Sequence, residues 1–235
     1  MTSLPPTATG RTSMFWTLPN ILTLMRLLAA PGVAVMFLYF HRPWADWFAL
    51  VLFALAAITD FFDGYLARAW KQESRLGAML DPIADKAMVV IALLVITGYS
   101  GMDPWLILPA TAILFREVFV SGLREYLGDK AGLLKVTGLA KWKTTAQMTA
   151  IAVLFLAMGL EYVREVRNLR SHAELIATLS DIGTEEVSLV DLALVGGNIV
   201  WNAGLALIWL AAVLTLITGW DYFRKARPLL RDDAP

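Results

Sequence analysis

The residues of this sequence best suited to chemistry are two closely spaced pairs of aspartates. Asp60 and Asp63 are three residues apart, and Asp81 and Asp85 are four residues apart. At these spacings the two side chains of a pair project from the same face of a helix. The connection Ala69 to Leu80 would let two such helices run antiparallel. The four carboxylates could then converge at one depth.

Four converging carboxylates indicate a divalent cation. A charged side chain at the centre of a membrane helix costs about 2.5–3.5 kcal/mol, and neighbouring carboxylates raise each other's pKa. One or two bound metal ions would relieve both penalties. The sequence has no cysteine and only two histidines, His41 and His172, neither of which is near another potential ligand. The expected ligands are therefore oxygen atoms, which favour Mg²⁺ or Mn²⁺.

Two glycines flank the aspartates. Gly64 directly follows Asp63, and Gly77 precedes Asp81 by four residues. Because glycine has no side chain, a bulky group can approach the backbone at these positions. Both glycines would make room beside the metal for a nucleotide or a diphosphate. Helix–helix packing is the alternative role of Gly64.

The elements that must position these residues are membrane helices. The chain is 58% apolar and 17% charged, against about 45–50% and about 25% in soluble domains. The apolar residues form blocks of about twenty, the length that crosses a hydrocarbon layer of about 30 Å. We therefore expect an all-α polytopic membrane protein with six transmembrane helices. These helices are predicted at residues 20–40, 44–69, 81–100, 104–124, 144–160 and 192–223.

Three segments outside these helices have a distinct composition. Residues 1–13 are rich in Thr, Pro and Ser and are expected to form a flexible tail before a membrane domain over residues 14–235 that starts with a short interfacial segment. The first apolar block is long and has no small-residue cleavage site after it, so we expect it to be retained. Residues 161–191 are a polar insertion with seven acidic and three basic residues. Its apolar residues recur at helical spacing, which is compatible with a surface helix, but we expect a solvated connector without a chemical role.

The distribution of basic residues predicts the orientation. With the N-terminus inside, sixteen of the twenty Lys and Arg residues fall on the inner side, and only Arg42, Arg164, Arg167 and Arg170 fall outside. Positive charge concentrates on the cytoplasmic side of membrane proteins. We therefore expect both termini and the aspartates to face the cytoplasm, with the insertion outside.

The aspartate motif resembles the signature of the CDP-alcohol phosphatidyltransferase family. The matching pattern is Asp60-x-x-Asp63-Gly64-x-x-Ala67-Arg68, eight residues, Gly77-x-x-x-Asp81-x-x-x-Asp85. The resemblance implies a metal-dependent enzyme that displaces CMP from a CDP-linked lipid. It implies that Asp60, Asp63 and Asp81 bind the metal, and that Asp85 is the general base and a further ligand.

The resemblance also implies the donor site. It places Gly64, Ala67, Arg68 and Gly77 around the CDP group of the donor. Arg68 could instead be an interfacial cation that obeys the charge rule. Asn20 and Thr23 lie one turn apart at the inner end of the first helix, where they would add polar contacts to the nucleotide.

Further segments are most similar to bacterial family members that use sn-glycerol 3-phosphate as acceptor. These segments are 18–26, 76–86, 116–125 and 141–148, and the likeness does not extend over 161–191. It implies the reaction of CDP-diacylglycerol with sn-glycerol 3-phosphate, in the bacterial inner membrane, by a homodimer. The expected partners are these two substrates and membrane lipid, with no nucleic acid.

The acceptor's phosphate requires a second anion-binding pocket. Arg116 and Arg124 are eight residues apart, on one helical face, and Lys143 lies at the start of the fifth helix. We expect these three cations to bind the acceptor phosphate. Arg116 lies within an apolar segment, where an unpaired cation is costly, so pairing with Glu117 or with one of the aspartates is the alternative.

Two other functions remain compatible with the sequence. A family member could use inositol phosphate, serine or phosphatidylglycerol as acceptor, because all would share the aspartate motif. Carboxylates within a membrane also occur in transporters and channels for divalent cations. Here the acidic residues crowd the inner boundary and the outer halves of the helices are almost purely apolar, which argues against an ion pathway.

Overall fold

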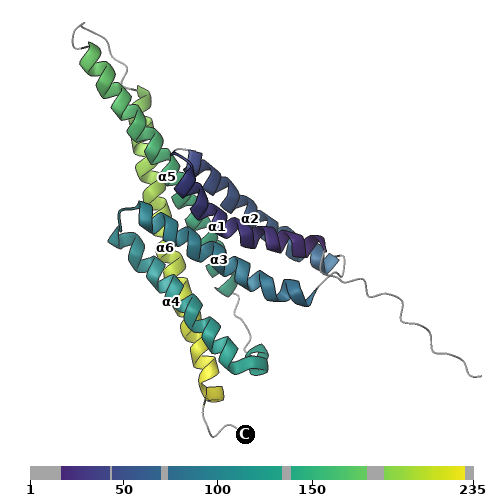
Figure 1. Cartoon of the computed structure of the whole chain (residues 1–235). Coiled ribbons are helices and arrows are strands. Elements are labelled where there is room, and N and C mark those ends of the chain that lie inside the picture. Colours follow the sequence, from purple (N-terminus) through teal and green to yellow (C-terminus); the bar gives the residue numbers. More distant parts are fainter. Residues whose placement is uncertain (1–16, 43, 70–73, 134–138, 179–187, 231–235) are drawn as a thin grey trace, which may run out of the picture.

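The described residues form six long helices that pack as a membrane bundle (Figure 1). The computed structural model describes residues 17–42, 44–69, 74–133, 139–178 and 188–230. Side chains are described outside the helical stretches 60–69, 139–141, 163–178 and 188–197 and the single positions 75, 129, 131 and 133. The predicted tail, residues 1–13, lies outside the described residues. The helices are α1 (Leu18–Tyr39), α2 (Trp44–Ala69), α3 (Arg75–Tyr99), α4 (Pro104–Leu127), α5 (Leu139–Thr178) and α6 (Ser188–Ala226), with short 3₁₀ turns η1 (Gly128–Leu133) and η2 (Arg227–Leu230).

Four of the described helices contain a stretch with the length and composition of a membrane span. Four stretches are long and apolar enough to cross a bilayer, and Trp44–Thr59 is a shorter apolar helix. The four stretches are Leu18–Tyr39, Pro104–Leu127, Trp142–Tyr162 and Asn198–Leu230. Large apolar side chains such as Leu38, Val118 and Phe115 are exposed around the bundle, as expected of a surface that contacts lipid. The predicted class, an all-α polytopic membrane protein with six helices, is confirmed.

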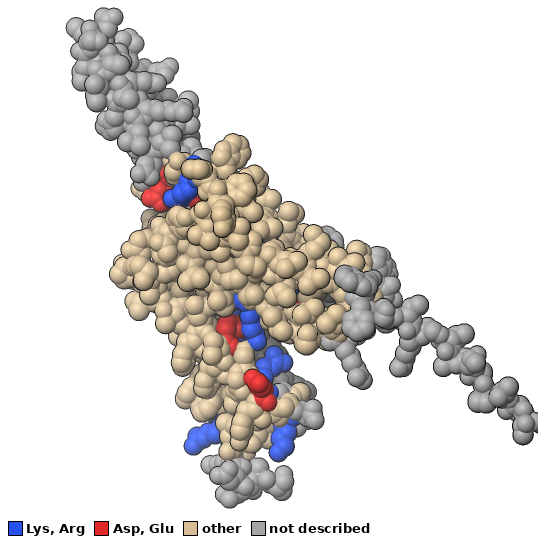
Figure 2. All heavy atoms as spheres, viewed as in Figure 1, with Lys and Arg blue, Asp and Glu red and all other residues tan. Residues whose placement is uncertain are grey.

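Charged side chains avoid the middle of the bundle surface. On the face shown in Figure 2 they gather near the emergence of α5 and over the lower half of α4, with uncharged surface between. Successive helices reverse direction, so the start of α1, the end of α2 and the start of α3 share one end of the bundle (Figure 1). The end of α4, the start of α5 and the C-terminal end of α6 belong to the same side. The predicted site residues belong to this side.

Two groups of helices make up the bundle. α1 packs against both α2 and α3, while α6 packs along α5 and against α4. α5 joins the groups, because it also contacts α2 and α3. Small residues allow the close approach that membrane helices require: a Cβ added to Gly204 of α6 would lie 2.7 Å from Leu154 Cδ2 of α5. α1 therefore stands beside both helices that carry aspartates.

α3 begins six residues earlier than predicted, at Arg75. The side chain of Ser74 caps the helix by accepting a hydrogen bond from the Gly77 amide at 3.0 Å, which satisfies one of the unpaired N–H groups of the first turn. The prediction placed the start at residue 81 and did not include this polar cap. As a result, Asp81 and Asp85 lie in the second and third turns of α3.

α5 is much longer than the predicted span 144–160. It continues without a break to Thr178, and α6 begins at Ser188. The two helices therefore extend past the bundle as an antiparallel pair, at the upper left of Figure 1. The helical spacing in the insertion 161–191 thus belongs to a continuation of α5 rather than to a separate surface helix. No proline or glycine occurs between Gly159 and Thr178 to end the helix.

A buried ion pair anchors α5 where it leaves the bundle. Arg42, in the α1–α2 connection, pairs with the fully buried Asp46 at 2.8 Å and donates to the Met158 carbonyl at 3.0 Å. Its guanidinium lies over the rings of Tyr99 and Tyr162. These contacts join α1, α2, α3 and α5 at the end opposite the aspartates.

Candidate active site

The second and third turns of α1 hold the aspartates of α3. The Thr23 hydroxyl donates to Asp81 Oδ1 at 2.6 Å. One turn further, Arg26 Nη1 donates to Asp85 Oδ1 at 2.8 Å and forms an ion pair with it. Thr23 and Arg26 are both 2% exposed, so each carboxylate is held from the protein interior. The Asp85 side chain is 39% exposed and remains accessible from the other side.

The same face of α1 also packs against the start of α3. Asn20 is 5% exposed, and its Oδ1 accepts a hydrogen bond from the Ser74 hydroxyl at 2.7 Å. A Cβ on the buried Gly77 would lie 2.7 Å from this Oδ1 atom and 3.3 Å from Ser74 Oγ. A side chain at this position would therefore have to displace Asn20 or Ser74 from the contact between α1 and α3. Its predicted role beside the nucleotide stays a prediction.

The other aspartate pair lies at the end of α2. The backbones of Asp60, Asp63, Gly64, Ala67 and Arg68 belong to the last turns of this helix, at the same end of the bundle as the start of α3 (Figure 1). Their side chains lie outside the described part of the chain. Among the described side chains, no group of three or more acidic or histidine residues comes together. The four-aspartate cluster stays a prediction.

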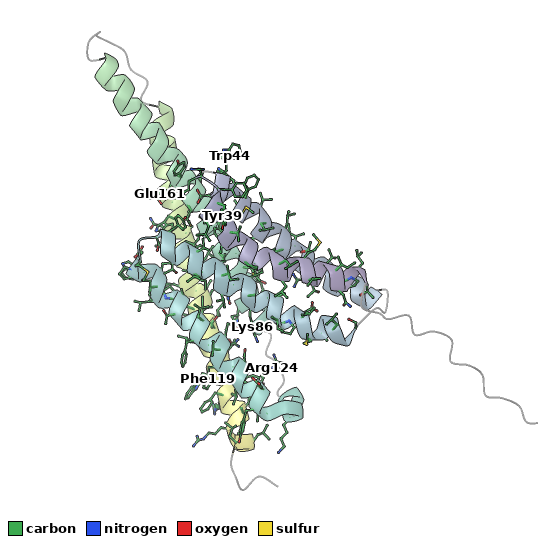
Figure 3. The ribbon with its side chains drawn as sticks, viewed as in Figure 1. Tyr39, Trp44, Lys86, Phe119, Arg124 and Glu161 are labelled. Atoms are coloured by element: carbon green, nitrogen blue, oxygen red, sulfur yellow. The ribbon has the colours of Figure 1, made fainter. Side chains whose placement is uncertain are left out.

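A pocket of about 250 Å³ opens beside Asp85, between α3, α4 and the start of α5. Lys86, Arg124 and Lys143 line it from these three helices. Figure 3 shows Lys86 and Arg124 approaching it from α3 and α4. The full lining is Pro82, Asp85, Lys86, Val89, Glu117, Arg124, Lys143, Thr144, Gln147 and Met148. Three cations beside one accessible carboxylate can bind an anion next to a proton acceptor.

Two of the three predicted acceptor-site cations meet at this pocket, and the third lies behind it. Arg124 and Lys143 both line the pocket, but Arg116 does not. Arg116 Nη1 pairs with Glu117 Oε1 at 3.2 Å, which is the alternative that the sequence left open. Its side chain packs at Gly219 of α6, where a Cβ would lie 2.8 Å from Arg116 Cγ.

Glu117 is the site residue that the sequence analysis did not select. It forms an ion pair with Lys143 in the pocket as well as with Arg116. The available signal was its position, because a carboxylate within an apolar helix needs a partner. The partner lies 26 residues away, and spacing along one helix could not identify it. Lys86 and Arg26 were likewise noted only as parts of motifs.

Comparisons with known proteins agree with the motif. The family model described as CDP-alcohol phosphatidyltransferase matches residues 16–217. A protein of Cereibacter sphaeroides is 68% identical over 221 residues, which cover 94% of this chain and 100% of the relative. A protein of Rickettsia bellii is 37% identical over 210 residues, or 89% of this chain and 95% of the relative. A protein of Escherichia coli is 41% identical over 143 residues, or 60% and 78%. All three relatives are named CDP-diacylglycerol--glycerol-3-phosphate 3-phosphatidyltransferase.

Proposed function

The chain belongs to the CDP-alcohol phosphatidyltransferase family, and we propose that it transfers the phosphatidyl group of CDP-diacylglycerol to sn-glycerol 3-phosphate. The products are phosphatidylglycerol phosphate and CMP. One observation carries the choice of acceptor: Asp85 lines the same pocket as Lys86, Arg124 and Lys143. An acceptor with its own phosphate fits three cations, and its hydroxyl then lies within the same pocket as the carboxylate.

The residues of α3 and α1 perform the transfer. The acceptor's hydroxyl oxygen attacks the phosphorus atom that carries the diacylglycerol, and the bond from this phosphorus to the oxygen of CMP breaks. Asp85 accepts the hydroxyl proton, and CMP leaves with the bonding electrons. Positioned proton transfer of this kind contributes about 10²–10⁴-fold. Arg26 and Thr23 act on the carboxylates of Asp85 and Asp81 from the buried side, which fixes their orientation.

A divalent metal is the cofactor that this donor set fits. Asp81 and Asp85 present carboxylate oxygens one turn apart on α3, and Asp60 and Asp63 follow the same pattern at the end of α2. Hard ions such as Mg²⁺ or Mn²⁺ prefer oxygen ligands and substrate phosphates. One or two such ions, when bound, neutralise charge on the diphosphate as CMP leaves.

The CDP group of the donor would bind where α1, α2 and α3 share an end. The proposed contacts come from Gly64, Ala67 and Arg68 of α2 and from Gly77 of α3. Asn20 and Thr23 shape the wall of this site, because their hydrogen bonds to Ser74 and Asp81 hold the start of α3 against α1.

We place the enzyme in the bacterial inner membrane as a homodimer, with the active site and both termini in the cytoplasm. The orientation rests on the sixteen inner Lys and Arg residues and on the charge rule. The homodimer rests on the family resemblance. The α5–α6 extension would then lie on the periplasmic side.

The acceptor is tested with purified enzyme and labelled CDP-diacylglycerol. Sn-glycerol 3-phosphate, inositol phosphate, serine and phosphatidylglycerol are offered separately, and CMP release and the lipid product are measured. We expect rapid turnover with glycerol 3-phosphate and at least a 100-fold lower kcat/KM with serine, which has no phosphate for the three cations. Preferred turnover of another acceptor would reassign the enzyme within the family. CMP release with none of the four would contradict the proposal.

A further inference from the structure

A single carboxylate oxygen of Glu117 contacts two cations at the inner end of the acceptor pocket. Its Oε1 atom accepts from Lys143 Nζ and from Arg116 Nη1, the latter at 3.2 Å. The side chains of Lys143 and Glu117 are 8% and 14% exposed. These contacts lie mostly out of water, where charges interact strongly. Glu117 thus has the place that an anion would take between two cations.

This arrangement differs from that of the other carboxylate of the pocket. Asp85 is 39% exposed, and Arg26 binds it from the buried side. Glu117 instead contacts Lys143, one of the cations that line the pocket. An incoming phosphate must share Lys143 with a carboxylate that is already there.

We infer that Glu117 is an internal counter-anion that weakens the binding of the acceptor phosphate at Lys143. This inference rests on the proposed function, in which the pocket binds the phosphate of the acceptor. Without a substrate, Glu117 satisfies two cations that would otherwise lie unpaired in an apolar environment, which is costly. With a substrate, it repels the phosphate and limits the retention of anions. Glu117 therefore makes the pocket selective for an acceptor that also contacts Arg124 and Lys86.

The inference predicts a gain in affinity when the charge of Glu117 is removed. In Glu117→Gln the amide oxygen can still accept a hydrogen bond from Lys143, so the geometry is retained while the negative charge is lost. We expect the KM for glycerol 3-phosphate to fall roughly three- to tenfold, about the size of one hydrogen bond between membrane helices. The inhibition constant of inorganic phosphate should fall by a similar factor. The KM for CDP-diacylglycerol should stay within twofold.

Glu125→Gln is the matched control. Glu125 lies on the same helix, is exposed and does not line the pocket. The substitution changes the net charge by the same amount, so it measures any effect of bulk charge. We expect all its kinetic constants to stay within twofold of the wild type. Glu117→Asp is the second test: it keeps the charge but withdraws the carboxylate from Lys143, and both constants should fall less than in Glu117→Gln.

The outcomes separate the inference from the function on which it rests. A merely structural Glu117 would raise the KM for the acceptor or lower kcat when it is replaced. Unchanged or raised acceptor KM in the folded Gln variant, or in the Asp variant if the Gln variant does not accumulate, would overturn the inference. Wild-type enzyme that releases no CMP with glycerol 3-phosphate would instead refute the proposed function.

Discussion

At the scale of single residues, the candidate site depends on buried partners that hold the carboxylates of Asp81 and Asp85 from the buried side. Thr23 and Arg26 reach Asp81 and Asp85 with hydrogen bonds of 2.6 and 2.8 Å, and both are almost fully buried. A carboxylate held in this way keeps its direction when water or substrate enters on its open side. Such positioning is what phosphoryl-type transfer requires, since most of its catalysis is orientation and charge neutralisation.

The metal-binding proposal predicts the behaviour of two amide variants. Asp85→Asn should lower kcat by about 10²–10⁴-fold, because the amide cannot accept the proton. Asp81→Asn should also abolish CMP release, because it removes an anionic metal ligand. CMP release is measured over a range of Mg²⁺ and Mn²⁺ concentrations, with membrane insertion checked by solubilisation and gel filtration.

Chelation provides the control for these variants. Wild-type enzyme treated with EDTA should lose activity and regain it when Mg²⁺ or Mn²⁺ is added, whereas neither variant should recover. Full activity of the wild type after exhaustive chelation would disprove the metal requirement. Substantial turnover by both amide variants would remove the aspartates from the mechanism.

At the scale of elements, the start of α3 is the part on which the site geometry depends most. The Ser74 cap, the Ser74–Asn20 hydrogen bond and the bare backbone of Gly77 together set the approach of α1 to α3. Every contact between α1 and the aspartates follows from this approach. A displacement of this turn would move Asp81 relative to Thr23.

Gly77→Ala tests this close approach. The new methyl group would lie 2.7 Å from Asn20 Oδ1 and 3.3 Å from Ser74 Oγ, so the two side chains or the helices must move. Overpacking of this kind costs about 1–3 kcal/mol. We expect a lower midpoint of thermal unfolding and at least a tenfold loss of kcat/KM for CDP-diacylglycerol.

Gly98→Ala, near the end of the same helix, is the matched control. Nothing lies within 4 Å of its added Cβ, and alanine favours a helix over glycine by about 1 kcal/mol. Unfolding temperature and activity should therefore be unchanged or slightly raised. Equal losses in the two variants would show that the cost of Gly77→Ala does not arise at the α1–α3 contact.

At the scale of the whole molecule, the α5–α6 extension lies far from the candidate active site. α5 continues for sixteen residues past Tyr162, or about 24 Å at 1.5 Å per residue. Gln147, which lines the pocket, lies fifteen residues before Tyr162, or about 22 Å along the helix. Arg42, which pairs with Asp46, also donates to the Met158 carbonyl of α5 near the base of the extension, so α5 is bound to the bundle before the extension begins.

Removal of the extension should leave catalysis intact. We propose to replace residues 163–197 with a four-residue glycine-rich turn, which keeps Tyr162 and the span from Asn198. We expect kcat and both KM values within threefold of the wild type, measured by CMP release. A folded but inactive variant would show that the extension contributes to the site or to assembly. Wild-type protein mixed with an equal amount of the variant would control for inhibition by the preparation itself.

The sequence by itself determined the class of the protein and the local pattern of its site. Apolar blocks of about twenty residues allow few structures other than membrane helices, and six helices are present. The spacing of Asp81 and Asp85 depends only on helical geometry within one segment. The spacing of Arg116 and Arg124 on one helix selected Arg124 in the same way, whereas Lys143 was selected from its position at the start of the fifth predicted helix.

Only the tertiary structure decided which of these groups meet. Thr23 finds Asp81 across 58 residues, Arg26 finds Asp85 across 59, and Glu117 finds Lys143 across 26. Such partners follow from how helices pack and rotate against one another, which periodicity within one helix does not specify. The packing of α4 against α6 also places the Arg116 side chain beside Gly219, where it pairs with the neighbouring Glu117.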